Sequence, residues 1–370
     1  MNQEVIRSRV FFYCGICIFL LEHFIPVFYQ FKGINETILL ILLMVLIGYS
    51  KWGTISRTTQ KSILGIILVL FFSFLIRLGH TGIGSIQTLL FCILQYLFLY
   101  KIKLSPKDYT IATISFFLFL LVYRYAPLNA YNTNTIGYTW GALGIYSTLL
   151  IKNNKLLFLS LISFYIILQI HLSDSRTAII AFVIYITIRY IPYSIFQNKY
   201  ILFSIMLALT FGGLLYVYSY IYMYENSIDV SWTREYSEKR FFSGRQFIWM
   251  EILDLLHEHP FTGIGSHVTL RSFKYVNIHN SALNFCAIYG YIVGSLVLYI
   301  IVKSVMTLRK YMDNYIIKNC FAGFVFFLII SFSETNLIFE SFSTLIPLCI
   351  AYSEFNRIRS NKLSQSNNHL

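Results

Sequence analysis

Polar side chains precede one long apolar run in a pattern that suits acid–base chemistry. The stretch KYVNIHNSALNFCAIYGYIVG places His279, Asn280 and Ser281 directly before that run. An imidazole accepts a proton near neutral pH, so His279 is a candidate catalytic base. Asn280 and Ser281 are of the residue types that cap helix N-termini, and they predict a helix that begins here. The competing interpretation of His279 is a histidine at a membrane surface with no chemical role.

Two arginines are candidates for holding a phosphate group. Arg176 lies in HLSDSRTAII, where an apolar run begins, and Arg245 lies in SGRQFIW, where another helix is expected to begin. A guanidinium stays charged and holds phosphate oxygens in a planar fork, and helix N-termini favour anions. The structural alternatives are an ion pair between Asp174 and Arg176 and a solvated loop arginine at position 245.

A polar stretch, NAYNTNTIGYTWGALG, contains side chains that could line a groove for a sugar. These are Asn132, Asn134 and Tyr138. The competing explanation is hydrogen bonding between helices together with close packing at the glycines, and for the glycines we prefer it.

Two glutamates near the C-terminus could support such a site. The stretch SFSETNLIFESFSTLI carries Glu334 and Glu340. A carboxylate at membrane depth is costly, and it either pairs with an arginine or orients a base. Proton-coupled transport would use the same residue type, so the glutamates alone do not identify a function.

Hydrophobic helices must position these residues. The chain has 370 residues, 57% of them hydrophobic and 12% charged, and its mean hydropathy is +0.64. Long apolar runs recur along it, which predicts an all-α polytopic protein with one membrane domain over residues 1–370 and about twelve transmembrane helices. The expected spans are 10–28, 36–50, 61–78, 85–100, 108–123, 134–151, 156–172, 175–192, 200–222, 280–302, 315–332 and 336–352.

The distribution of basic residues predicts the orientation. Most of the 29 Lys and Arg residues fall in alternate short loops, which places both termini in the cytoplasm. The net charge of +13 is therefore a topology signal, and no nucleic-acid partner is needed to explain it. Residues 223–278 then form a long outer loop, and residues 353–370 form a cytoplasmic tail that we expect to end in disorder. Arg124 and Arg176 are basic residues left at the outer face.

The long outer loop is expected to carry an amphipathic helix. In SGRQFIWMEILDLLHEHP, Ser243 and Gln246 have the spacing of a capping box, and Pro260 ends the pattern. The acidic and apolar residues fall on different faces, so we expect the helix to lie on the outer membrane surface.

Known cofactor motifs are absent from the sequence. All six cysteines fall inside apolar runs, and no zinc, P-loop or dinucleotide motif occurs. We expect neither a metal nor another cofactor.

Taken together and in order, these motifs resemble one superfamily. An Asn-Thr-Asn start of a polar span, SDSRTA, and then a long loop with GRQFIW, HPFTGIGS and a final HNSALNFCAIYGYIVG precede the glutamates of the last spans. This arrangement is similar to the O-antigen ligase and O-antigen polymerase (Wzy-type) membrane glycosyltransferases, over roughly residues 130 to 350.

The resemblance implies a multi-pass enzyme of the bacterial inner membrane that transfers glycans from undecaprenyl pyrophosphate on the outer face, by metal-independent inverting transfer. Lipid-linked glycans would be donor and acceptor, with membrane lipids and a chain-length regulator protein as further partners. His279 would be base or positioning group, and Arg176 and Arg245 would stabilise the leaving pyrophosphate. The candidate substrate-binding residues are Asn132, Asn134, Tyr138, Asn280, Glu334, Glu340 and Arg124.

Within this superfamily we favour a polymerase of O-antigen or capsule, because the Ile-, Tyr-, Phe- and Asn-rich composition is similar to that of many such polymerases. The alternative within the superfamily is a ligase that transfers O-antigen to the lipid A-core. The alternative from another class is a non-enzymatic exporter of lipid-linked sugar or polysaccharide, which would not need an ordered outer loop and would favour internal repeats.

Overall fold

The computed structural model describes most of the chain. The described residues are 3–30, 34, 37–43, 83–126, 133–152, 175–226, 228, 244–265, 270, 278–339 and 341–367.

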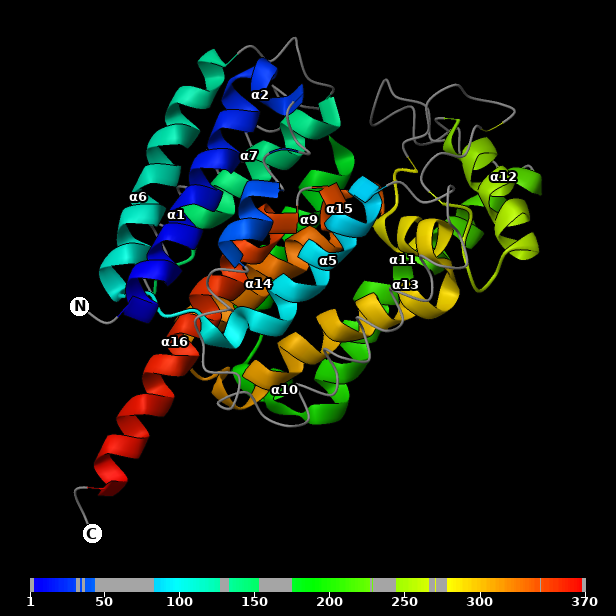
Figure 1. The fold of residues 1–370 in the computed structure, drawn as a ribbon. Helices are drawn as coiled ribbons and strands as arrows, with labels where there is room; N and C mark the ends of the chain where they lie inside the picture. Colours follow the sequence, from blue (N-terminus) through cyan, green and yellow to red (C-terminus); the bar gives the residue numbers. More distant parts are fainter. Residues whose placement is uncertain are drawn as a thin grey trace.

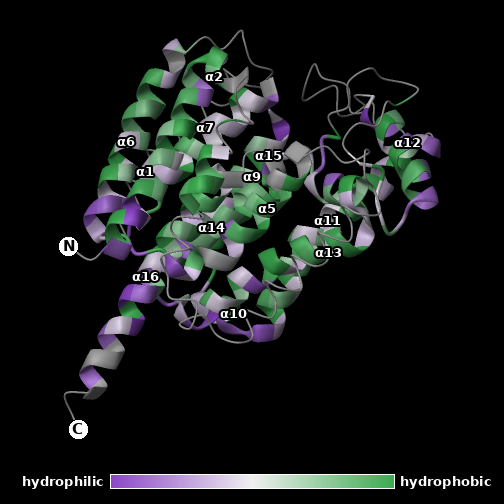
Figure 2. Ribbon diagram, viewed as in Figure 1, coloured by the Kyte–Doolittle hydropathy of each residue, from purple (hydrophilic) through white to green (hydrophobic). Residues whose placement is uncertain are grey.

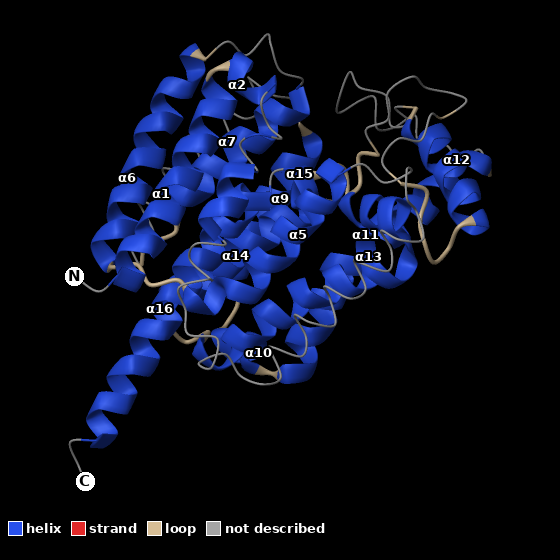
Figure 3. Cartoon of the chain, viewed as in Figure 1, coloured by secondary structure: helices blue, strands red, loops and turns tan. Residues whose placement is uncertain are grey.

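Every regular element in these residues is a helix (Figures 1 and 3). The α-helices are α1 Gln3–Phe24, α2 Pro26–Gln30, α5 Ile83–Phe98, α6 Pro106–Val122, α7 Thr133–Thr148, α9 Arg176–Tyr190, α10 Tyr193–Gln197, α11 Lys199–Glu225, α12 Arg245–Glu258, α13 Ser281–Leu308, α14 Tyr315–Ile330, α15 Asn336–Phe339 and α16 Ser341–Asn367. Three 3₁₀ turns are η2 Leu99–Lys101, η3 Tyr123–Tyr125 and η6 Arg309–Tyr311. The all-α prediction is confirmed for this part of the chain.

The predicted count of about twelve membrane spans is not confirmed. Among the described residues, two helical stretches are long and apolar enough to cross a membrane, Lys199–Glu225 and Ser281–Tyr311, and Tyr315–Ile330 is a shorter apolar helix. The expected spans 61–78 and 156–172 lie outside the described residues, as does part of 36–50.

Asparagine caps begin three of the long helices. The side chains of Asn198, Asn280 and Asn314 accept hydrogen bonds from the first-turn N–H groups of α11, α13 and α14. These N–H groups have no partner inside the helix, so a side-chain acceptor at this position decides where each helix starts.

Helix α14 forms the centre of the main core. Its residues from Asn319 to Ile330 are all buried, and it packs chiefly against α9 and α16. Helix α7 also reaches it, and a Cβ at Gly141 would lie 2.2 Å from the ring of Phe326. Close packing between helices therefore accounts for Gly141, as expected from the sequence.

A second, smaller core lies at one end of the α11–α13 pair, around α12 (Figure 1). It joins Val217 and Tyr220 of α11, Trp249 and Ile252 of α12, and Leu283 of α13. The apolar face of α12 is thus buried against protein. The sequence instead predicted a helix that lies on the outer membrane surface with this face. Helix α12 and the turn at residues 260–265 after it belong to the folded body.

Several helices carry apolar side chains on their outward surfaces. Hydrophobic residues run along most of α1, α6, α11 and α13 (Figure 2). Large exposed side chains include Leu118 of α6, Ile180 of α9 and Leu215 of α11. Exposed apolar surface on this scale is typical of a membrane or protein contact.

Helix α13 is broken at Gly290. This residue has φ 81° and ψ 166°, outside the helical region, so the element consists of a short half (residues 281–289) and a long half (residues 291–308). The sequence predicted one continuous span over 280–302, and the structure corrects this. Backbone contacts from the turn after α12 cause the break and are described below.

The C-terminal residues are also more ordered than expected. Helix α16 continues to Asn367 and extends away from the body beside the N-terminal end of α1 (Figure 1). The prediction of a disordered end to the tail is therefore wrong for residues up to 367.

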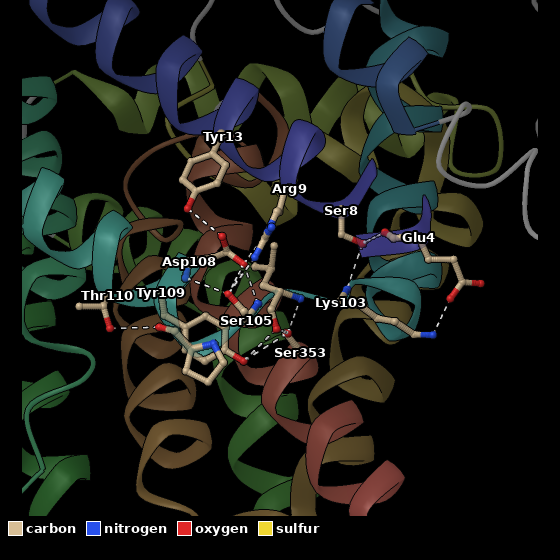
Figure 4. Close-up of polar contacts among 12 residues, drawn as sticks. Glu4, Ser8, Arg9, Tyr13, Lys103, Ser105, Asp108, Tyr109, Thr110 and Ser353 are labelled. Atoms are coloured by element: carbon tan, nitrogen blue, oxygen red, sulfur yellow. Dashed lines mark hydrogen bonds and ion pairs between the residues drawn. The ribbon is translucent and has the colours of Figure 1, made fainter. Parts of the chain in front are cut away.

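A polar cluster ties α1 to the start of α6 (Figure 4). The carboxylate of Asp108 accepts hydrogen bonds from Arg9 Nε at 2.9 Å, Tyr13 Oη at 3.0 Å and Ser105 N at 2.6 Å. Ser105 in turn caps α6 and completes a capping box with Asp108. One carboxylate thus fixes both the start of α6 and its contact with α1.

We predict that Asp108→Ala destabilises the fold by about 2–4 kcal/mol, because it removes the reciprocal half of the capping box and leaves the partly buried donors of Arg9 and Tyr13 without this acceptor. The measurement is the thermal unfolding midpoint of the purified protein in detergent. Thr110→Ala is the control, since its hydroxyl makes one exposed bond to Pro106, and it should change the stability by less than about 0.5 kcal/mol. Equal midpoints for the two variants would contradict the assignment.

Candidate functional site

Three side chains from distant parts of the sequence meet at the carboxylate of Glu334. Asn134 Nδ2 donates to Oε1 at 2.7 Å, Arg245 Nη2 contacts the same oxygen at 3.3 Å, and His279 Nδ1 contacts Oε2 at 3.3 Å. The side chains of Arg245, His279 and Glu334 are 17%, 24% and 19% exposed. They are partly withdrawn from solvent and still reachable, as a binding site requires.

Glu334 lies in the tight turn between α14 and α15. Its N–H donates to the Ile330 carbonyl at 3.0 Å, and its own carbonyl accepts from the Ser281 hydroxyl at 2.9 Å. The N–H of Ser281 donates to the Ser331 carbonyl at 2.9 Å. Two hydrogen bonds from Ser281, one from its hydroxyl and one from its N–H, therefore hold the start of α13 against the turn that carries the carboxylate.

His279 has a strained backbone that its neighbours hold in place. Its φ is 50°, in the left-handed region that residues other than glycine seldom adopt. The preceding carbonyl, of Ile278, accepts from the buried Trp249 indole at 2.6 Å. The following residue, Asn280, donates to the carbonyls of Gly213 and Phe332, both at 2.9 Å, and accepts from Leu283 N at 2.8 Å. Strain of this kind persists only where the surroundings over-determine it, and it is common at functional sites.

Arg245 is the first residue of α12. The N-cap is Gly244, with φ 88° and no side-chain cap. The sequence predicted Ser243 as the N-cap, in a capping box with Gln246, whereas in the structure the N-cap is Gly244. Ser243 lies outside the described residues. Gln246 is buried, and its Oε1 has no hydrogen-bond partner among the described residues. The helix ends at Glu258, two residues before Pro260, as expected.

The residues that meet at Glu334 all come from helix starts. Asn134 is the second residue of α7, Arg245 is the first of α12, and His279 lies two residues before α13. Helix N-termini carry partial positive charge, so their convergence favours an anion at this point. Arg176 is the first residue of α9, and it and Arg245 both lie in the neighbourhood of Tyr216 of α11.

The remaining predicted residues are not placed at Glu334. The Tyr138 hydroxyl bonds to Ser343 in the core, where Tyr138 is 3% exposed. Asn132 and Glu340 lie outside the described residues, and for Arg124 the structure describes only the backbone, in η3. A substrate contact at any of these four positions stays a prediction.

Sequence reasoning singled out Ser281 only as a helix cap, and it missed that Ser281 and Trp249 help to hold the site together. Trp249 donates to the carbonyl of Ile278, beside His279, and Ser281 donates to the carbonyl of Glu334. Neither hydrogen bond can be predicted from the sequence. The available signals were the tryptophan on the apolar face of α12 and the polar turn SFSETN between two apolar helices.

Comparison with known proteins identifies part of the chain. Residues 158–299 match the family model of O-antigen ligase (Wzy_C). The matched segment contains Arg176, Arg245, His279 and Asn280, whereas Asn134 and Glu334 come from outside it. The match supports the membrane-integral O-antigen ligase and polymerase superfamily and a role in membrane glycosyl transfer for polysaccharide synthesis, without distinguishing ligase from polymerase. No curated protein and no solved structure matches the chain.

We predict that Asn280→Ala lowers stability by about 2–4 kcal/mol, because it removes the helix cap and leaves two buried carbonyls without donors. Asn280→Ser is the matched variant: it keeps a cap acceptor while losing the two donated bonds. Thermal unfolding of the purified protein should rank the wild type above Asn280→Ser and Asn280→Ala lowest. An unfolding midpoint of Asn280→Ala equal to that of the wild type would show that the side chain does not join these segments.

Proposed function

We propose that this protein polymerises undecaprenyl-pyrophosphate-linked repeat units into O-antigen or capsular polysaccharide on the outer face of the bacterial inner membrane. The observation that carries the proposal is the contact of His279 and Arg245 with one carboxylate, Glu334, within partly exposed surroundings. A base and a cation held side by side suit a reaction in which a hydroxyl attacks while a phosphate group leaves.

His279 would take the proton of the acceptor hydroxyl. An ionised carboxylate only accepts hydrogen bonds, so at the Glu334 contact Nδ1 carries the hydrogen and Nε2 keeps the lone pair. As the hydroxyl oxygen bonds to the anomeric carbon of the donor sugar, its proton passes to Nε2. The bond from that carbon to the pyrophosphate oxygen breaks, and the electron pair leaves with the lipid pyrophosphate.

Arg245 and Arg176 would hold the departing pyrophosphate. Negative charge grows on its oxygens in the transition state, and fixed guanidinium groups and helix N-termini stabilise charge there without reorganising. In the structure Arg245 forms an ion pair with the Glu334 carboxylate. A bound phosphate would compete for Arg245, leaving the Glu334 carboxylate to orient the histidine.

The choice of acceptor separates the polymerase from its nearest alternative. The matched family is described as O-antigen ligase, which favours transfer to the lipid A-core as the second candidate function. The polymerase is preferred on the Ile-, Tyr-, Phe- and Asn-rich composition.

We predict that His279→Ala and His279→Gly each reduce glycan transfer by at least about 100-fold, because the base is lost. Glycine adopts φ 50° without strain, so His279→Gly should be at least as stable as His279→Ala. The assay contains purified protein in lipid and lipid-linked repeat units alone, with products resolved by length on a gel. His257→Ala, at an exposed position of α12, is the control and should retain activity.

A ladder of longer lipid-linked chains from the wild type would support a polymerase. Chain transfer only after lipid A-core is added would instead indicate a ligase. Full activity of folded His279→Ala would overturn the assignment of the site in either case.

We predict that Glu334→Gln reduces turnover about 10- to 100-fold, because it removes the charge that orients His279 and pairs with Arg245 while keeping the side-chain shape. The measurement is the initial rate of transfer at saturating donor, with the unfolding midpoint as a check on folding. Glu258→Gln, on the exposed face of α12, should match the wild type. An unchanged rate for Glu334→Gln would remove this carboxylate from the mechanism.

A further inference from the structure

The break in α13 involves an exchange of backbone hydrogen bonds with another segment. In a continuous helix the N–H of Tyr291 would donate to the carbonyl of Ala287. Here the Tyr291 N–H donates to the Pro260 carbonyl at 2.8 Å, and the Ala287 carbonyl accepts from the Ile264 N–H at 2.6 Å. Both groups freed by the break are therefore satisfied by the glycine turn, residues 260–265, that follows α12.

Two glycines allow this exchange. Gly263 has φ 70° and Gly290 has φ 81°. A Cβ on Gly263 would lie 2.5 Å from Gly290 N, and a Cβ on Gly290 would lie 2.2 Å from the Phe261 carbonyl oxygen. Backbone meets backbone on both sides, so neither position can take a side chain without separating the two segments.

The glycine turn connects the two halves of the candidate site. It follows directly on α12, whose first residue is Arg245. It bonds to α13 on both sides of the break, at Ala287 in the short half and at Tyr291 in the long half, and the short half begins two residues after His279. The indole of Trp249 makes a second link between the same two segments, at the Ile278 carbonyl. The position of Arg245 relative to His279 therefore depends on α12 being fastened at both points.

We propose that the glycine turn is a clip that sets the spacing of Arg245 and His279 around Glu334, with Gly263 and Gly290 as positioning residues. For its effect on catalysis the inference rests on the proposed glycan transfer. The clip itself is a property of the fold. Without it, α12 and the short half of α13 can move separately, and a base displaced by about 1 Å loses of the order of 100-fold in rate.

The first test uses hydrogen exchange of the full-length protein in lipid. Opening of one clip exposes the amides of both Ile264 and Tyr291, so their exchange rates should agree within about threefold. In Gly263→Ala both should exchange at least about tenfold faster, while the amides of α13 from residue 295 onward keep their protection. Gly244→Ala has the same left-handed strain, and a Cβ there meets nothing within 4 Å, so it should leave both amides unchanged.

The second test measures glycan transfer by the same variants. Gly263→Ala and Gly290→Ala should each lower turnover about 10- to 100-fold. The double variant should be no slower than either single variant, because each substitution already separates the same two segments. Phe261→Ala, whose side chain is 69% exposed, should behave as wild type.

The outcomes separate the clip from the proposed function. Unrelated exchange rates of Ile264 and Tyr291 in the wild type, or unchanged rates in Gly263→Ala, would overturn the clip. Faster exchange with full turnover, or additive losses in the double variant, would overturn its positioning role. Absence of transfer by the wild type with either acceptor would contradict the proposed function, while the exchange measurement would still test the clip.

Discussion

The side chain of Asn280 is the constraint on which the rest of the site depends. It is fully buried, and it bonds to α11 through Gly213, to the turn after α14 through Phe332 and to the first turn of α13 through Leu283. A primary amide supplies two donors and an acceptor in one plane, so one residue satisfies groups on three segments. Replacing it costs stability because buried carbonyls cannot recover water as a partner.

That arrangement explains how a strained histidine persists. Hydrogen bonds between side chains and backbone on both sides of His279 fix its neighbours, and the φ of 50° follows from where those neighbours must lie. The carboxylate of Glu334 then holds the imidazole, and the same carboxylate receives Arg245 and Asn134. Partial withdrawal from water strengthens these charge interactions, which suits the proposed stabilisation of a departing phosphate.

Helix α12 and the turn at residues 260–265 therefore act as part of the folded body. The helix buries Trp249 and Ile252 in a core shared with α11 and α13, and the turn accepts from and donates to backbone groups at the break in α13. Polar backbone groups freed in an apolar setting need partners, and broken helices occur where other protein supplies them. In this protein the partner segment is the one that also carries Arg245.

The sequence by itself determined the helical class, the capped start of α13 at Asn280 and the end of α12 before Pro260, because these depend on local composition and on bonds within one turn. It also singled out His279, Arg245 and Glu334 as residue types suited to the chemistry. Only the tertiary structure decided that the three meet, since Asn134, Arg245 and His279 lie 200, 89 and 55 positions from Glu334. The break at Gly290 was likewise hidden, because the apolar pattern predicts a continuous helix and the groups that stabilise the break come from the turn at residues 260–265. Contacts between segments far apart in sequence leave no periodic trace in either one, and those contacts bring His279 and Arg245 to the Glu334 carboxylate.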